Sequence, residues 1–238
     1  VGEVATIDQI ENVGYWHQAH SFVRGNWRNS SQSSPMILQK SCHDLDIISW
    51  LAGRPCRWIS SFGSLQHFDA AHAPEGAPDN CMKGCPHSEA CPYYAPKIYL
   101  TGETEWPVDV LTTDLTEEGI RKALEEGPYG RCVYHCDNDL VDHQVVNMEY
   151  EGGVTASFTM TAFTARINRE LKIMGTRGQI TADMNARKIV LERFGQEARE
   201  IPYEEEGWDQ FGHGGGDFGI VKNFLELLEG TGDNRTSA

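Results

Sequence analysis

The sequence lacks any uninterrupted apolar stretch of about 18 residues, the length that a helix needs to cross a bilayer. Its first residues also lack the basic and then apolar run that is typical of a secretory signal. These absences predict a cytoplasmic protein without a membrane partner.

Positive charge is also scarce, with 20 Lys and Arg residues against 35 Asp and Glu residues and a formal net charge of −15. Binding to the phosphates of a nucleic acid requires clustered Lys and Arg side chains, which would here face a repulsive field. We therefore expect no nucleic acid partner. Acidic runs such as 204–206 are typical of a solvated polar face and indicate nothing more specific.

Length and composition indicate an ordinary globular protein, since 39% of its 238 residues are hydrophobic and 23% are charged. These values predict one domain that spans residues 1–238. The chain starts with Val1 rather than with Met, and strand-like alternation follows at once. We expect from this start that the chain is part of a longer protein.

Hydrophobic periodicity predicts an α+β fold, with an open, mainly antiparallel β-sheet and helices packed on one of its faces. Glycines in the segment 151–153 favour a tight hairpin turn, because glycine accepts a positive φ. Residues 69–115 lack periodicity and carry Pro, Gly and three closely spaced Cys, which predicts an irregular insertion or lid. Strands are expected at Val4–Val13, Trp58–Phe68, Val141–Tyr150, Val154–Phe163, Leu171–Met174, Gln179–Met184 and Lys188–Phe194, and helices at Gln39–Leu51, Thr116–Glu126 and Asp217–Leu228.

A glycine-rich string, Gly214 to Gly219, satisfies the G-x-G-x-x-G pattern of dinucleotide sites and precedes a predicted helix. That fingerprint requires a buried strand before it, a second strand after it and an acidic residue about 20 positions further on. Here the preceding residues 204–210 are polar and acidic, so we expect no Rossmann domain in this chain. His213 and the glycines could instead present donors to an oxygen-rich ligand, or form a flexible turn before a helix.

The segment from Lys40 to Asp46 concentrates titratable side chains. On one helix, Lys40 and Asp44 lie four residues apart, and His43 and Asp46 lie three apart. A histidine held by a carboxylate suits transfer of a proton to or from a sugar hydroxyl while hydride leaves the same carbon. We therefore predict His43, Lys40 and Asp46 as catalytic residues, the alternatives being a packing or capping histidine and a solvated lysine.

Aromatic and polar residues are dense between Tyr15 and Arg28. Flat aromatic faces together with amide and guanidinium donors suit carbohydrates and other polyols, although simple core packing explains such a pattern as well. The predicted substrate-binding residues are Tyr15, His17, Arg24, Asn26, Trp27, Gln39 and His213.

Several of these features follow one another in a recognisable order. They are an opening strand, the triplet 26–28, a helix with His43, Asp46 and Trp50, a strand meander that contains 180–182, and residues 212–217 before an amphipathic helix. This order and spacing resemble the C-terminal domain of the glucose-fructose oxidoreductase, inositol dehydrogenase and MocA (Gfo/Idh/MocA) family. The resemblance covers nearly the whole chain and does not depend on one rare motif.

The resemblance implies a two-domain parent, in which a Rossmann domain binds NAD or NADP and the present domain binds substrate and pairs subunits through its sheet. It also implies an Asp-x-x-x-His helix motif with catalytic partners, and a catalytic Lys in a Glu-Lys-Pro triplet of the Rossmann domain. His43 matches the family His, whereas Gln39 occupies the Asp position, and Lys40 is expected to compensate. The chain contains no Glu-Lys-Pro triplet, and we expect it to be inactive on its own.

Five cysteines lie in or after the irregular segment, with the spacings C-x3-C-x5-C over 81–91 and C-x3-C over 132–136. Thiolates gathered in a loop too polar to build its own core suggest a structural metal, with zinc preferred over an iron–sulfur cluster. Free thiols and disulfides are the alternatives, and the cytoplasm disfavours disulfides. The predicted ligands are Cys81, Cys85, Cys91 and Cys136, with Cys132 or His87 as alternatives for the last.

The sequence thus favours an oxidoreductase domain that acts on a sugar, inositol or related polyol. The alternative is a non-catalytic sugar-binding or scaffold protein that uses the same sandwich fold. A metal-dependent hydrolase is disfavoured, because thiolate ligands typically fill a closed structural site.

Overall fold

A computed structural model describes residues 1–202 and 215–232 of the chain. The chain divides into two compact units, Val1–Glu200 and Ile201–Ala238. The second unit contains the helix α6 (Gly216–Leu228), which confirms the helix expected near the C-terminal end. His213 and Gly214, for which we expected contact with an oxygen-rich ligand or a turn before the helix, lie outside the described residues.

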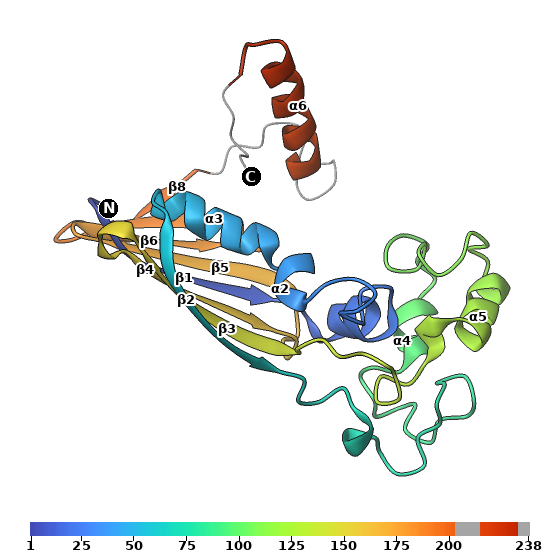
Figure 1. The fold of residues 1–238 in the computed structure, drawn as a ribbon. Helices are drawn as coiled ribbons and strands as arrows, with labels where there is room; N and C mark the ends of the chain where they lie inside the picture. The colour runs from blue at the N-terminus through green and yellow to red at the C-terminus, as the bar shows by residue number, and fades with distance from the viewer. Residues whose placement is uncertain (203–214, 233–238) are drawn as a thin grey trace. The chain divides into compact units, whose positions relative to one another are not determined.

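A mixed eight-stranded sheet organises the first unit, in the strand order β2-β3-β4-β1-β5-β6-β7-β8 (Figure 1). β1 and β4 pair in parallel, whereas the pairs β2–β3, β3–β4, β1–β5, β5–β6 and β6–β7 are antiparallel. The predicted open and mainly antiparallel sheet is therefore confirmed, with β8 as a strand that the sequence did not indicate. The strands are β1 (Val4–Asn12), β2 (Cys56–Ser64), β3 (His143–Tyr150), β4 (Thr155–Thr161), β5 (Asn168–Gly175), β6 (Gly178–Asp183), β7 (Lys188–Arg193) and β8 (Arg199–Ile201).

The connection between β3 and β4 forms the tight turn that its glycines predict. A short 3-10 segment, η4 (Glu151–Gly153), joins the two strands. Gly152 and Gly153 have φ values of 80° and 84°, a region that side chains with a Cβ rarely adopt. The sequence therefore determines this hairpin locally.

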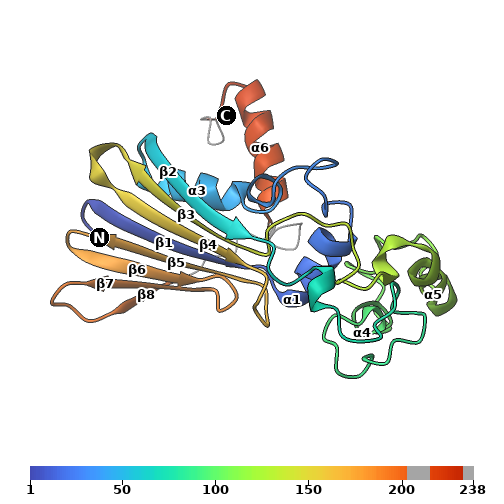
Figure 2. The same ribbon diagram turned by 60° about the horizontal axis from the view of Figure 1, so that its bottom comes forward.

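Helix α3 (Cys42–Ala52) covers one face of the sheet (Figures 1 and 2). Ile48 of this helix is completely buried, together with Ile7 of β1 and Phe158 of β4. Side chains alternate across a strand, so every second residue of β1 faces this core. The predicted packing of helix on one sheet face is confirmed.

The continuous helix expected over Gln39–Leu51 is wrong at its start. Helix α2 (Met36–Gln39) ends before Lys40, and α3 begins only at Cys42. Lys40 and Ser41 have φ values of −111° and −110°, and Lys40 turns its side chain to a buried carboxylate on β1. The expected four-residue spacing of Lys40 and Asp44 on one helix therefore does not exist.

The predicted irregular segment and the residues directly before and after it form several short helices beyond one end of the sheet (Figures 1 and 2). Contrary to the expectation of a loop too polar for a core, Ala95, Tyr99 and Leu124 are completely buried in an apolar cluster there. Aromatic residues of the irregular segment and apolar residues of the helix that follows it form this core. The polar average composition of the segment does not indicate it. The helices are α1 (Tyr15–His17), the π-helix η1 (Gln18–Arg24), the 3-10 segments η2 (Ala70–His72) and η3 (Pro128–Gly130), α4 (Ala95–Tyr99) and α5 (Glu117–Glu126).

Thr116, where the sequence predicts a helix to begin, caps helix α5, because its Oγ1 accepts a hydrogen bond from the backbone N–H of Gly119 at 3.1 Å. Replacing Thr116 by alanine leaves this N–H without its side-chain partner. We expect the free energy of unfolding to fall by about 1 kcal/mol. Urea unfolding of Thr116→Ala and Thr116→Ser measures this effect, and equal losses for the two variants would contradict the role of the hydroxyl.

The helices formed by the described residues are short. The longest are α6 with 13 residues and α3 with 11. A transmembrane helix needs about 20 residues, and no helix in the described part of the chain is long and apolar enough to cross a membrane.

Candidate active site

A buried carboxylate near the end of β1 holds two cationic side chains. Glu11 is completely buried, and its Oε1 accepts a hydrogen bond from Lys40 Nζ at 2.5 Å. Arg169 Nε lies 2.8 Å from the other oxygen, Oε2, because Arg169 stands opposite Glu11 in the register of β5 and β1. Burial raises the pKa of Glu11, and the two cations oppose that rise. The ion pair of Lys40 with Glu11 thus holds the segment between α2 and α3 against strand β1.

A second buried carboxylate, Asp44, joins this cluster from the first turn of α3. Its Oδ1 accepts hydrogen bonds from Arg169 Nε at 2.8 Å and from Gln9 Nε2 at 2.6 Å. Asp44 and Glu11 therefore share one guanidinium, and Lys40 provides the second positive charge. Two carboxylates and two cations balance in charge, as buried ionic groups must.

His43 lies at the exposed edge of this ionic cluster. Its side chain is 55% exposed, and its Nε2 lies 2.5 Å from Arg169 Nη2 and 3.4 Å from Asp44 Oδ2. A guanidinium has only donors, so the hydrogen bond from Arg169 requires His43 Nε2 to accept and Nδ1 to carry the proton. The arrangement presents an imidazole to solvent and fixes it from behind with Arg169 and Asp44.

His17 borders the same cluster from α1. The positive charges of Lys40 and Arg169 both act on its ring, but burial is the main reason why its pKa falls to about 3. Trp106 of the irregular segment packs edge-on against it, with ring centroids 5.1 Å apart. His17 is therefore neutral at physiological pH, with an aromatic wall on one side.

Several buried polar atoms around Lys40 have no hydrogen-bond partner among the described residues. They are Gln9 Oε1, His17 Nδ1, Gln39 Oε1 and Ser41 Oγ. Buried polar groups in proteins are nearly always paired, and each unpaired one costs free energy. Their concentration beside Lys40 indicates a place where a ligand rich in hydroxyl groups could complete the pairing.

Not all predicted site residues reach this cluster. The ring of Tyr15 contacts Tyr93, and Arg24 is completely buried, where it donates to the carbonyls of Arg131 and Tyr93 at 2.7 and 2.6 Å. Asn26 is exposed, and Trp27 is 53% exposed. Of the predicted residues, the structure thus places His17, Gln39, Lys40 and His43 in or beside the ionic cluster of Glu11, Lys40, Asp44 and Arg169. Arg24 lies away from that cluster and is completely buried.

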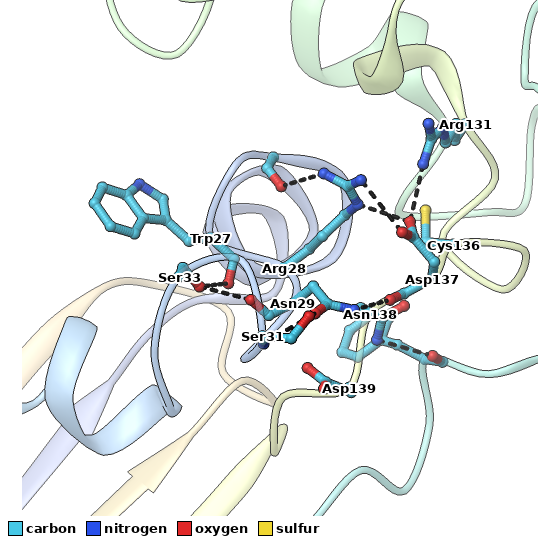
Figure 3. Close-up of polar contacts among 12 residues, drawn as sticks. Trp27, Arg28, Asn29, Ser31, Ser33, Arg131, Cys136, Asp137, Asn138 and Asp139 are labelled. Carbon is cyan, nitrogen blue, oxygen red and sulfur yellow. Dashed lines mark hydrogen bonds and ion pairs between the residues drawn. The ribbon is translucent and has the colours of Figure 1, made fainter.

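Figure 3 shows how the segment after Trp27 is held. Arg28 forms a bidentate pair with Asp137, with distances of 2.7 and 3.2 Å, and Arg131 Nη1 reaches the same carboxylate at 3.0 Å. Asn29 donates to the carbonyl of Asp137 at 3.1 Å. These contacts fix the segment to residues 131–139, while the Trp27 carbonyl accepts from Gln39 Nε2 at 2.8 Å.

The carboxylate that the structure places against His43 belongs to Asp44 and not to the expected Asp46. Asp44 points into the core from the first turn of α3, whereas Asp46 is exposed on the same helix. The sequence pattern did not indicate Gln9, Glu11 and Arg169. Gln9 and Glu11 lie two and four residues after Ile7, on the same face of the predicted strand, and this position could have indicated buried polar side chains. Arg169 is recognised only from the pairing of β5 with β1.

Two histidines, the half-buried His17 and the buried His20, predict how stability depends on pH. Burial lowers the pKa of His17 to about 3 and that of His20 to about 4, from an ordinary value of 6.5. Between about pH 6.5 and 4 the unfolded chain binds these protons and the folded chain does not, so acidification favours unfolding. We expect the free energy of unfolding to fall by up to about 1.4 kcal/mol per pH unit for each histidine.

Urea unfolding at a series of pH values across this window measures the slope. Glu11, whose pKa burial raises, acts in the opposite direction, so the histidine contribution is isolated by comparison with His17→Gln and His20→Gln. Each variant should show a smaller slope than the unaltered protein. An unchanged slope in both variants would contradict the assignment.

The comparison with known families identifies the chain. Residues 1–215 match the model described as "Oxidoreductase family, C-terminal alpha/beta domain". The chain belongs to the Gfo/Idh/MocA oxidoreductase family, of which it carries the C-terminal α/β domain. The expected family resemblance is therefore confirmed.

Three similar proteins share little sequence identity with this chain. YteT of Bacillus subtilis (strain 168), whose name ascribes to it an oxidoreductase activity, is 23% identical over 192 residues, which are 77% of this chain and 42% of YteT. A levoglucosan dehydrogenase in complex with NADH and levoglucosan has a TM-score of 0.58 at 13% identity, with coverage of 100% of this chain and 52% of that one. A super-repressor mutant of Gal80p from Saccharomyces cerevisiae has a TM-score of 0.56 at 11% identity, with coverage of 97% and 46%.

At these identities the structural matches show the fold alone. The chain spans about half the length of the proteins it matches, 42% of YteT and 52% of the levoglucosan dehydrogenase. Two neighbours with the same fold carry names of different kinds, a dehydrogenase and a repressor, so the fold does not by itself determine activity.

Proposed function

We propose that this chain is the substrate-binding half of an NAD(P)-dependent oxidoreductase that acts on a sugar, an inositol or a related polyol. The observation that carries the proposal is the group of unpaired buried polar atoms beside Lys40 and His43. Amide, imidazole and hydroxyl groups in one place match the many donors and acceptors of a polyol. Family membership supports the class of reaction.

The side chains of this chain would handle the proton of the reaction. His43, held by Asp44 and Arg169, would take the proton of the substrate hydroxyl at Nε2 as the carbon of that hydroxyl loses hydride. Arg169 would have to withdraw its hydrogen bond from Nε2 when the hydroxyl binds there. Lys40, fixed by Glu11, would stabilise the developing negative charge on the oxygen. The catalytic role of Asp46 remains a prediction; its carboxylate is exposed and lies one helical turn after His43.

Bound NAD or NADP would supply the hydride acceptor. The described residues contain no parallel βαβ unit with a glycine-rich turn, since the parallel pair β1 and β4 is not joined in that way. We therefore assign no cofactor-binding residue to this chain. The proposal places the nucleotide mainly on residues outside it.

The proposal includes a homo-oligomer formed through the face of the sheet opposite α3. Trp58 and Phe62 of β2 are 69% and 71% exposed, and the neighbouring Val145 of β3 is 39% exposed. Exposed apolar side chains of this size favour association between subunits. Light scattering on the full-length protein tests it, because Phe62→Glu should lower the molar mass of an oligomer to that of a monomer.

Assays on the full-length protein test the proposed function. Purified protein is incubated with NAD⁺ or NADP⁺ and each of a series of sugars and inositols, and the absorbance of the reduced nicotinamide is followed. Reduction with at least one polyol supports the proposal. Calorimetric binding of a polyol without turnover would favour the alternative, a non-catalytic sugar-binding protein, and neither binding nor turnover with any polyol would contradict both.

A further inference from the structure

Four cysteines from two distant segments line one small cavity in the first unit. Cys81, Cys85 and Cys91 come from the irregular segment, and Cys132 follows η3 about forty residues later. Cys81 and Cys132 are buried, and the other two are half-buried. Folding has thus gathered four sulfur atoms that the sequence separates.

Arg24 lines the same cavity and is completely buried. Its Nη2 lies 3.8 Å from the sulfur of Cys81, and its Nη1 has no hydrogen-bond partner among the described residues. Its other partners are the carbonyls of Arg131 and Tyr93 and the phenol of Tyr99, which is neutral at physiological pH. Within the described part of the chain, no carboxylate pairs with Arg24.

A buried guanidinium is always protonated and is costly without a counter-charge. Neutral thiols do not provide that charge. Four thiolates around a divalent cation carry a net charge of about −2, which would compensate Arg24. The cavity therefore contains the cysteine ligands that a metal centre requires. It also contains the Arg24 guanidinium, whose positive charge a negatively charged metal–thiolate centre would balance.

We propose that Cys81, Cys85, Cys91 and Cys132 bind one structural zinc ion beside Arg24. This ligand set replaces Cys136 of the sequence prediction by Cys132. The sulfur of Cys136 donates to the carbonyl of Cys132 at 3.3 Å, and Cys136 does not line the cavity. Zinc prefers four thiolates in closed structural sites.

Binding requires adjustment of the cysteine side chains. Among the described residues, no three His, Cys, Asp or Glu side chains are already spaced as metal ligands. Rotation about the Cα–Cβ bond moves each cysteine sulfur among three staggered positions, and each thiol releases its proton to solvent as it binds. The zinc ion would cross-link residues 81–91 to Cys132 and so fix the part of the chain that carries Trp106 beside His17.

Metal analysis of the full-length protein, purified under reducing conditions without chelator, tests the proposal. We expect about one zinc ion per chain by mass spectrometry. Cys91→Ser should reduce the zinc content to background, and the exposed Cys56→Ser, as a matched control, should leave it unchanged. Loss of zinc in Cys136→Ser or His87→Asn, with retention in Cys132→Ser, would overturn the ligand set.

Zinc-edge X-ray absorption on the unaltered protein gives a result that does not depend on the folding of any variant. Four sulfur neighbours at about 2.3 Å are expected. Nitrogen or oxygen atoms in the first coordination sphere would overturn the four-cysteine site. Protein free of metal would overturn the proposal, and iron with acid-labile sulfide in place of zinc would overturn the identity of the metal.

Discussion

Replacing His43 by asparagine in the full-length protein is expected to lower kcat about 10²- to 10⁴-fold, with a much smaller change in KM. Asparagine keeps a polar side chain next to Arg169 but cannot accept a proton from a substrate hydroxyl. His43 is 55% exposed, so the substitution leaves the core intact. Steady-state kinetics with the polyol substrate found in the assays above measure the effect.

The matched control for this substitution is His72→Asn. His72 is also partly exposed, at 46%, and pairs with Asp69 in the irregular segment far from Lys40 in the sequence. We expect its kcat to equal that of the unaltered protein. If His43→Asn turned over as fast as this control, His43 would not be the base, and Lys40 would remain as the candidate for the proton transfer.

A second variant tests the role of the carboxylate behind His43. Asp44→Asn keeps a hydrogen-bond acceptor for Arg169 and Gln9 but removes the negative charge next to the imidazole. We expect it to lower kcat with a much smaller change in KM, because the positive charge that forms on His43 during proton transfer loses its counter-charge. Unchanged kcat in Asp44→Asn would exclude Asp44 from the proton transfer.

Local features of this fold were readable from the sequence. The hairpin at Gly152 and Gly153, the cap at Thr116 and most strands follow from side-chain pattern and backbone preference within a few residues. The histidine of the site was also found, since His43 lies in a short segment rich in titratable groups. Each of these inferences needs only neighbouring residues.

The partners of His43 were not readable, because they depend on contacts between distant segments. Arg169 reaches Glu11 because these two residues are partners in the register of β5 against β1, although they are 158 positions apart in the sequence (169 − 11). The break between α2 and α3 is a second case. Helical periodicity continues through Lys40, but pairing with buried Glu11 and the non-helical Ser41 end the helix there.

The largest expected effect on stability comes from Arg169→Met. This change leaves Asp44 with Gln9 as its remaining buried donor and leaves Glu11 with Lys40 alone. The side chains of Glu11 and Asp44 are both completely buried. Removal of one partner from a buried ion pair typically costs about 3–5 kcal/mol, since an uncompensated charge stays in the core. Urea unfolding of the two proteins near neutral pH measures the loss.

A double variant shows whether this cost comes from charge or from packing. Asp44→Asn in the Arg169→Met background removes the carboxylate that has lost its partner, so it should restore part of the lost free energy. The same Asp44→Asn change in the unaltered protein should destabilise, because it leaves Arg169 with a weaker acceptor. Opposite signs in the two backgrounds require direct electrostatic coupling of Arg169 with Asp44. Equal effects would mean that Arg169 stabilises the fold through the packing of its side chain alone, and that the cluster behind His43 is not an ionic network.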